Sequence, residues 1–176
     1  FKPKKARSGC TISNKRLTSC CCGGSIVCVN PAARLSHLQA MTIESAGVDE
    51  LAAGFAAIRG LRSWLDATEA HLARRQDLLA ATTGARPAAD ALAQGRKMSR
   101  RAAERAADRA AVLGATPEMG RQLSNGNISA EHVDALTSAA KGLDETQRAG
   151  LFDHHHELAL AAAAKTPEQF GRHVRQ

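Results

Sequence analysis

Large apolar side chains recur every seven residues in the region from about Val48 to Ala81. The recurring residues are Leu51, Ile58, Leu65, Leu72 and Leu79. Seven residues are close to two turns of an α-helix, so these side chains form one stripe along it. The spacing predicts a long amphipathic helix that packs its stripe on its own domain and ends at Thr82-Thr83-Gly84.

A coiled coil through the same stripe is the alternative. It needs a second apolar column beside the first to complete its seam. The positions of that column are Gly54, Leu61, Thr68 and Arg75. Because Thr68 and Arg75 are polar, we favour packing within the domain over a zipper. The stripe remains a candidate surface for self-association.

Capping and terminating residues predict a series of shorter helices farther along the chain. Their expected starts or caps are Pro87, Ser99, Thr116-Pro117, Ser129, Asp144 with Gln147, and Thr166-Pro167. The helix that begins after Asp144 is expected to run to Ala164. No segment alternates apolar and polar residues as a strand would. We therefore predict an all-α fold of about six helices.

Composition separates residues 1–40 from residues 41–176. The chain has 176 residues and a formal net charge of +7. Seven of its 24 basic residues and no acidic residue lie in residues 1–40, which leaves 17 basic and 17 acidic residues in the remainder. The first segment also holds all five cysteines, namely Cys10, Cys20, Cys21, Cys22 and Cys28. We predict a basic cysteine-rich tail, either disordered or a non-native product of upstream translation, followed by one helical domain.

The cysteines of the tail do not have the spacing of a metal site, which needs two separated ligand pairs. A lipoprotein or secretory segment is equally poor, because Lys15 and Arg16 stand directly before Leu17, where an apolar run should begin. No stretch approaches the 18 or so apolar residues of a membrane span. We expect a cytoplasmic protein without a membrane partner; a zinc or redox role for the tail stays an alternative.

Four basic residues at four-residue spacing form a positive ridge around the helix that Ser99 caps. They are Lys97, Arg101, Arg105 and Arg109. An arginine-rich helix behind a turn can read DNA as a helix-turn-helix. The turn from Gly95 to Ser99 is longer than the tight version of that motif, and Glu104 and Asp108 offset part of the charge. A solvated face is the favoured interpretation, and the ridge is kept as a candidate DNA contact.

The sequence contains no recognisable catalytic motif. His154-His155-His156 is the most conspicuous run, but consecutive helical residues point about 100° apart and cannot close on one ion. Glu157, three residues after His154, can form one weak pair with it. No phosphate loop or paired-carboxylate motif is present. We expect no enzyme activity, no metal, no cofactor and no small-molecule substrate.

One motif resembles a known family. Leu123, Gly126, Ile128, Ser129 and His132 match its core of leucine, two residues, glycine, any residue, isoleucine, serine, two residues and histidine. The segment resembles the actinobacterial domain-of-unknown-function family two-hundred-and-twenty-two, also called the thirteen-E-twelve repeat family. The resemblance extends more loosely back to about Val48. The motif is dominated by helix-cap chemistry, so His132 is expected to have a structural role.

The resemblance implies a function. Members of this family typically carry the helical region in front of an HNH nuclease domain, and residues 1–176 contain no His-Asn-His pattern. The implied role is a non-catalytic N-terminal region that is DNA-associated or positions a nuclease domain missing from this chain. The alternative is a helical protein–protein interaction or dimerisation module, or a truncated remnant with no independent activity.

Overall fold

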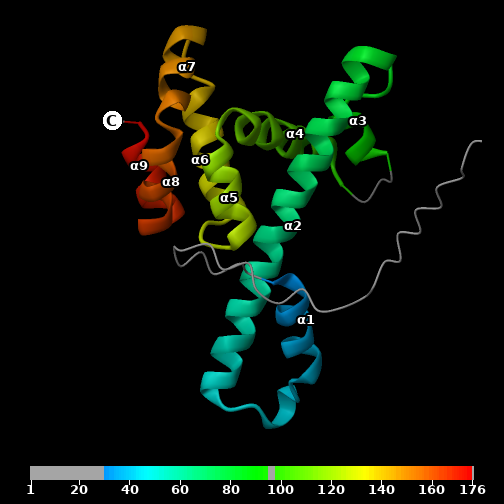
Figure 1. The fold of residues 1–176 in the computed structure, drawn as a ribbon, viewed down its shortest axis with the longest axis vertical. Helices are drawn as coiled ribbons and strands as arrows, with labels where there is room; N and C mark the ends of the chain where they lie inside the picture. Colours follow the sequence, from blue (N-terminus) through cyan, green and yellow to red (C-terminus); the bar gives the residue numbers. More distant parts are fainter. Residues whose placement is uncertain (1–29, 95–97, 176) are drawn as a thin grey trace, which may run out of the picture.

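The computed structural model describes residues 30–94 and 98–175, and within them all regular structure is helical (Figure 1). The predicted all-α fold is confirmed. The helices are α1 (Pro31–Ala40), the short 3-10 helix η1 (Ile43–Ser45), α2 (Val48–Thr83), α3 (Ala88–Ala93), α4 (Arg100–Ala115), α5 (Pro117–Asn125), α6 (Ala130–Ala140), α7 (Glu145–Asp153), α8 (His155–Ala164) and α9 (Pro167–His173).

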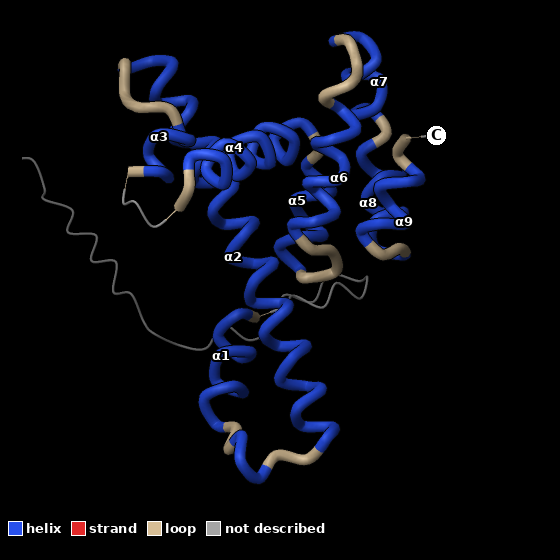
Figure 2. Tube along the Cα trace, turned by 180° about the vertical axis from the view of Figure 1, so that it is seen from behind, coloured by secondary structure: helices blue, strands red, loops and turns tan. Residues whose placement is uncertain are grey.

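The arrangement is organised around α2. Its 36 residues make a rod about 54 Å long. α1 runs back along the first half of this rod, and the pair projects as a helical hairpin (Figure 1). α3 lies beside the far end of α2, α4 crosses its second half, and α5–α9 gather on one side (Figure 2).

Most of the large buried side chains lie in the part built from α5, α6, α8 and α9. Met119, Leu123, Val133, Leu136 and Phe170 are each fully buried there. The contact between α2, α3 and α4 is different, because its buried cluster consists of Ala70, Ala73, Ala88 and Ala110. The C-terminal helices therefore hold the conventional core, and α2 is attached through small side chains.

The predicted caps are confirmed where the structure gives a side-chain bond. The Ala102 N–H donates to Ser99 Oγ at 3.2 Å and starts α4. Asp144 and Gln147 form the expected reciprocal box: the Gln147 N–H donates to Asp144 Oδ1 at 2.8 Å, and the Asp144 N–H donates to Gln147 Oε1 at 3.2 Å. Thr166 and Gln169 form the same box at the start of α9. These helix starts depend on residues close in sequence, so they can be predicted from the sequence.

Three sequence predictions need correction. Residues 31–40 belong to the predicted tail, but they form α1, which Asn30 caps by accepting the Ala32 N–H at 3.0 Å. The helix expected from Asp144 to Ala164 is two helices, because His154 has a non-helical ψ of 22°. The described residues also contain more helices than the six expected. The remaining predictions for the tail, including its five cysteines, lie outside the described residues.

Packing against α2 explains α1 better than periodicity does. The Arg34 guanidinium occupies the space above Gly60, where a Cβ atom would overlap its Nη1. It also lies beside Gly126, the left-handed residue (φ 75°) that ends α5, so the cation faces the negative end of that helix. Gly54 is covered in the same way by Met41 and Leu38. Two glycines of α2 thus let α1 approach closely.

We expect Gly60→Ala to lower the free energy of unfolding by about 1–3 kcal/mol, because the new Cβ displaces the Arg34 side chain. Chemical denaturation followed by circular dichroism measures the change. The control is Gly150→Ala, at an exposed position of α7 with no atom within 4 Å of the added Cβ, which should leave stability unchanged or raise it by about 1 kcal/mol. Equal effects of the two variants would contradict the proposed close approach.

Candidate interaction surface

α2 buries its small residues and not its leucines. The buried residues of this helix are Gly54, Ala57, Gly60, Ser63, Ala67, Ala70 and Ala73. They repeat at intervals of three or four residues, so they form a continuous face that meets α1, α5 and α4. Small side chains let neighbouring helices approach closely, and this face provides the internal packing of the long helix.

The leucine stripe faces elsewhere, and the prediction that it packs on its own domain is wrong for its central residues. Leu65 is 57% exposed and Leu72 is 68% exposed. Leu51, Ile58 and Leu79 are half-buried. Arg34 lies at the level of Gly60 and α1 begins one turn earlier, so α1 accompanies α2 only as far as about Trp64. Beyond that level no helix of the described residues covers Leu65 and Leu72, and α3 lies beside the stripe near Leu79.

An apolar groove of about 710 Å³ follows this uncovered part of the stripe. Leu65, Leu72 and Leu79 line it from α2, and Ala88, Ala91 and Leu92 line it from α3. Thr68, Glu69, Arg75 and Gln76 form its polar edges. Exposed leucines that line a groove with polar edges are typical of a surface that binds another protein segment.

The predicted basic ridge is divided by the structure. Arg101 and Arg105 are exposed, and no carboxylate among the described residues lies within ion-pair distance of them. Arg109 is instead taken up internally: its Nε and Nη2 donate to the Asp134 carboxylate at 2.9 and 3.0 Å, and its Nη1 lies 3.8 Å from Asp66 Oδ1. Lys97 lies outside the described residues.

Arg109 joins three helices electrostatically, since Asp66 belongs to α2 and Asp134 to α6. Burial alone would lower the pKa of Arg109, but the hydrogen bonds to Asp134 and the negative charges of Asp134, Asp66 and Glu69 raise it above its usual value. Burial raises the pKa of Asp66, and the Arg109 charge opposes that rise. This guanidinium therefore acts in the fold, and the accessible basic charge of the ridge is reduced to Arg101 and Arg105.

The motif residues form the joint between α5 and α6. Gly126 ends α5, and Leu123 and Ile128 are buried on either side of it. The Ser129 N–H donates to His132 Nδ1 at 3.1 Å, and His132 Nε2 then donates to the Lys165 carbonyl at 3.0 Å. The imidazole therefore connects the start of α6 to the end of α8. This structural role is the one expected for His132.

Two residues of the histidine run, His154 and His156, are exposed, whereas His155 is half-buried and its Nδ1 is buried without a hydrogen-bond partner among the described residues. His154 Nδ1 lies 2.8 Å from Glu157 Oε2, which is the single pair expected there. Across residues 30–94 and 98–175, no group of three or more histidine, cysteine or acidic side chains is placed to hold a metal ion. Over the same residues, no helix has both the length and the apolar character needed to cross a membrane.

We expect Arg109→Ala to lower the free energy of unfolding by about 2 kcal/mol, because it leaves Asp66 and Asp134 without their shared cation. Arg101→Ala is the matched control on the same helix and should change stability by less than about 0.5 kcal/mol. Thermal and urea unfolding measure both. An Arg109 variant as stable as the Arg101 variant would show that the ion pair contributes nothing to the fold.

Comparison of the chain with protein-family models, with curated proteins and with solved structures finds no match. The resemblance at Leu123–His132 therefore stays a prediction from the motif alone.

Proposed function

We propose that the chain is a helical association module that binds a second copy of itself through the leucine stripe of α2. The observation that carries this proposal is the uncovered groove, in which Leu65 and Leu72 are mostly exposed although small residues bury the other side of the same helix. Burying a leucine side chain stabilises an interface by about 1.5–3 kcal/mol. Two such residues on each copy support a dimer of moderate affinity.

A helix of the same chain already packs on α2 in the way proposed for the second copy. α1 already lies antiparallel to α2 on the preceding part of the helix, with Leu38 against Gly54 and Arg34 against Gly60. The groove along the stripe runs from Leu65 to Leu79, where α3 flanks it, and is centred on the exposed Leu72. A second copy presents an identical helix segment of the same length, so the two can cover each other symmetrically.

Charge favours an antiparallel pair. Antiparallel pairing about Leu72 brings Leu65 opposite the second copy's Leu79, and it places Arg75 near Thr68 and Glu69 near Gln76, so no like charges meet. Parallel pairing through the heptad seam places Arg75 against Arg75 of the second copy, which is unfavourable.

Leu65→Glu and Leu72→Glu are expected to raise the dissociation constant of the dimer by about tenfold or more, because each buries a carboxylate among leucines. Sedimentation equilibrium over a wide range of protein concentration measures it. Leu78→Glu is the control, since Leu78 is 54% exposed but projects from another side of α2. A parent chain that is monomeric at every concentration would refute self-association and leave the groove to a different segment or protein.

Orientation is tested by cross-linking a chain whose five native cysteines are changed to serine. Leu72→Cys should form a disulfide-linked dimer, because two copies of residue 72 meet at the symmetry axis. Leu65→Cys should not, because its two copies lie about 21 Å apart along the antiparallel helices. Efficient cross-linking of Leu65→Cys would contradict the antiparallel arrangement.

DNA association, in a protein that positions a nuclease domain, is the second candidate function. It rests on the motif resemblance and on Arg101 and Arg105, which are exposed one turn apart without a carboxylate partner among the described residues. Phosphate contacts by two such side chains release counterions and make binding weaken as salt is added.

If these arginines contact phosphates, Arg101→Ala with Arg105→Ala should reduce the log–log slope of DNA affinity against salt by about 1.8. Fluorescence anisotropy with a labelled duplex gives the slope. Arg59→Ala, an exposed arginine on α2, is the control and should leave it unchanged. An unchanged slope in the double variant would exclude the ridge as the DNA contact.

A further inference from the structure

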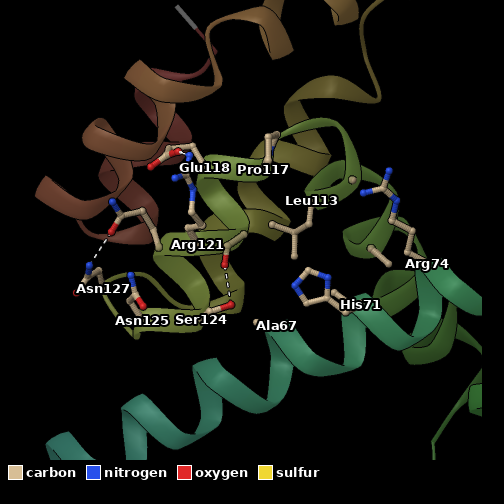
Figure 3. A pocket seen from close by; sticks show the side chains of 15 residues that line it. Ala67, His71, Arg74, Leu113, Pro117, Glu118, Arg121, Ser124, Asn125 and Asn127 are labelled. Atoms are coloured by element: carbon tan, nitrogen blue, oxygen red, sulfur yellow. Dashed lines mark hydrogen bonds and ion pairs between the residues drawn. The ribbon is translucent and has the colours of Figure 1, made fainter. Parts of the chain in front are cut away.

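A cleft of about 760 Å³ lies on the side of α2 away from the leucine stripe (Figure 3). One wall is α2, with Ala67, His71 and Arg74, and the other is α5. The end of α4 closes it with Leu113 and Gly114. Successive helical residues turn by 100°, which places Arg74 about 160° around the helix from Leu72, so the cleft and the groove are separate surfaces.

Gly120 is the most informative residue of this cleft. It sits in the middle of α5 and is buried, yet a Cβ atom added there would meet no atom within 4 Å. Its φ is not positive, so the backbone does not require glycine. Glycine inside a helix costs about 1 kcal/mol relative to alanine. No close protein contact offsets that cost, and the empty space above Gly120 belongs to the cleft.

The polar groups at the rim favour an anion. The Arg74 guanidinium lies over the end of α4, with Cζ and Nε 3.1 Å from the position of a Cβ on Gly114. There the guanidinium faces the negative end of α4. No carboxylate of the described residues lies within ion-pair distance of it. Glu118 is the one carboxylate of the lining, and Arg121 already pairs with it. In Figure 3 the His71 ring and Leu113 lie between Arg74 and Arg121.

We propose that this cleft binds a small organic anion, with its carboxylate or phosphate at Arg74 and His71 and its apolar part on Gly120, Ala67 and Leu113. The guanidinium offers paired donors to an oxyanion. The absent side chain at Gly120 lets a flat apolar group approach the α5 backbone. The volume lies in the range of small-molecule sites. This site goes beyond the association function and does not depend on it.

The experiment titrates the full chain with benzoate, phenyl phosphate and the neutral control benzyl alcohol, followed by amide shifts in ¹H–¹⁵N spectra. The two anions are expected to give saturable shifts at Gly114, Gly120 and Asn125, and benzyl alcohol is not. The relative affinities of benzoate and phenyl phosphate show which oxyanion the site prefers.

Two variants locate the site. Arg74→Gln removes a surface charge and should weaken anion binding about tenfold. Gly120→Leu fills the space above α5 and should abolish binding, whereas Gly150→Leu, at an exposed glycine of α7 with open space around it, should not. Equal shifts with benzyl alcohol, the absence of saturation, or unchanged affinity in Arg74→Gln would each overturn the proposal. The Arg74→Gln test remains decisive even if Gly120→Leu fails to fold.

Discussion

The rest of the structure depends on how closely other helices can approach α2. Its buried face has no side chain larger than serine or alanine, which lets α1, α4 and α5 pack directly on its backbone. Arg34 over Gly60 is the clearest case. Because internal packing uses the small residues, Leu65 and Leu72 of the same helix are left facing outward. Two of these small residues, Ala67 and Ala70, also line the wall of the cleft.

Arg109 complements this packing where α4 lies between α2 and the C-terminal helices. α4 crosses α2 on one side and contacts α6 on the other, and the guanidinium reaches carboxylates on both. Alanine contacts provide little orientational specificity, since many rotations of one helix on another bury the same area. A cation with one carboxylate on each neighbour selects a single orientation of the three helices.

Most local features were predictable from the sequence, and features set by distant residues were not. Ser99, Asp144 with Gln147, and Thr166 bond within three residues, so their caps and the all-α fold could be predicted. The seven-residue spacing located α2 but gave the wrong buried face, because it weights leucine over alanine. α1 was missed because charge and cysteine content placed residues 31–40 in the tail, although its Asn30 cap is as local as the others. Arg109 looked equivalent to Arg101 since Asp66 and Asp134 are far from it in sequence, and no motif indicated that Gly120 borders empty space.

The contrast between the two kinds of packing has a thermodynamic consequence. The heat capacity change on unfolding scales with the apolar area that becomes exposed. The alanine contacts of α2 with α3 and α4 expose little such area, whereas Phe170, Met119 and Leu136 expose much more. The part built on α2 therefore contributes little to the heat capacity change. The C-terminal helices contribute most of it, and so most of the curvature of the unfolding free energy with temperature.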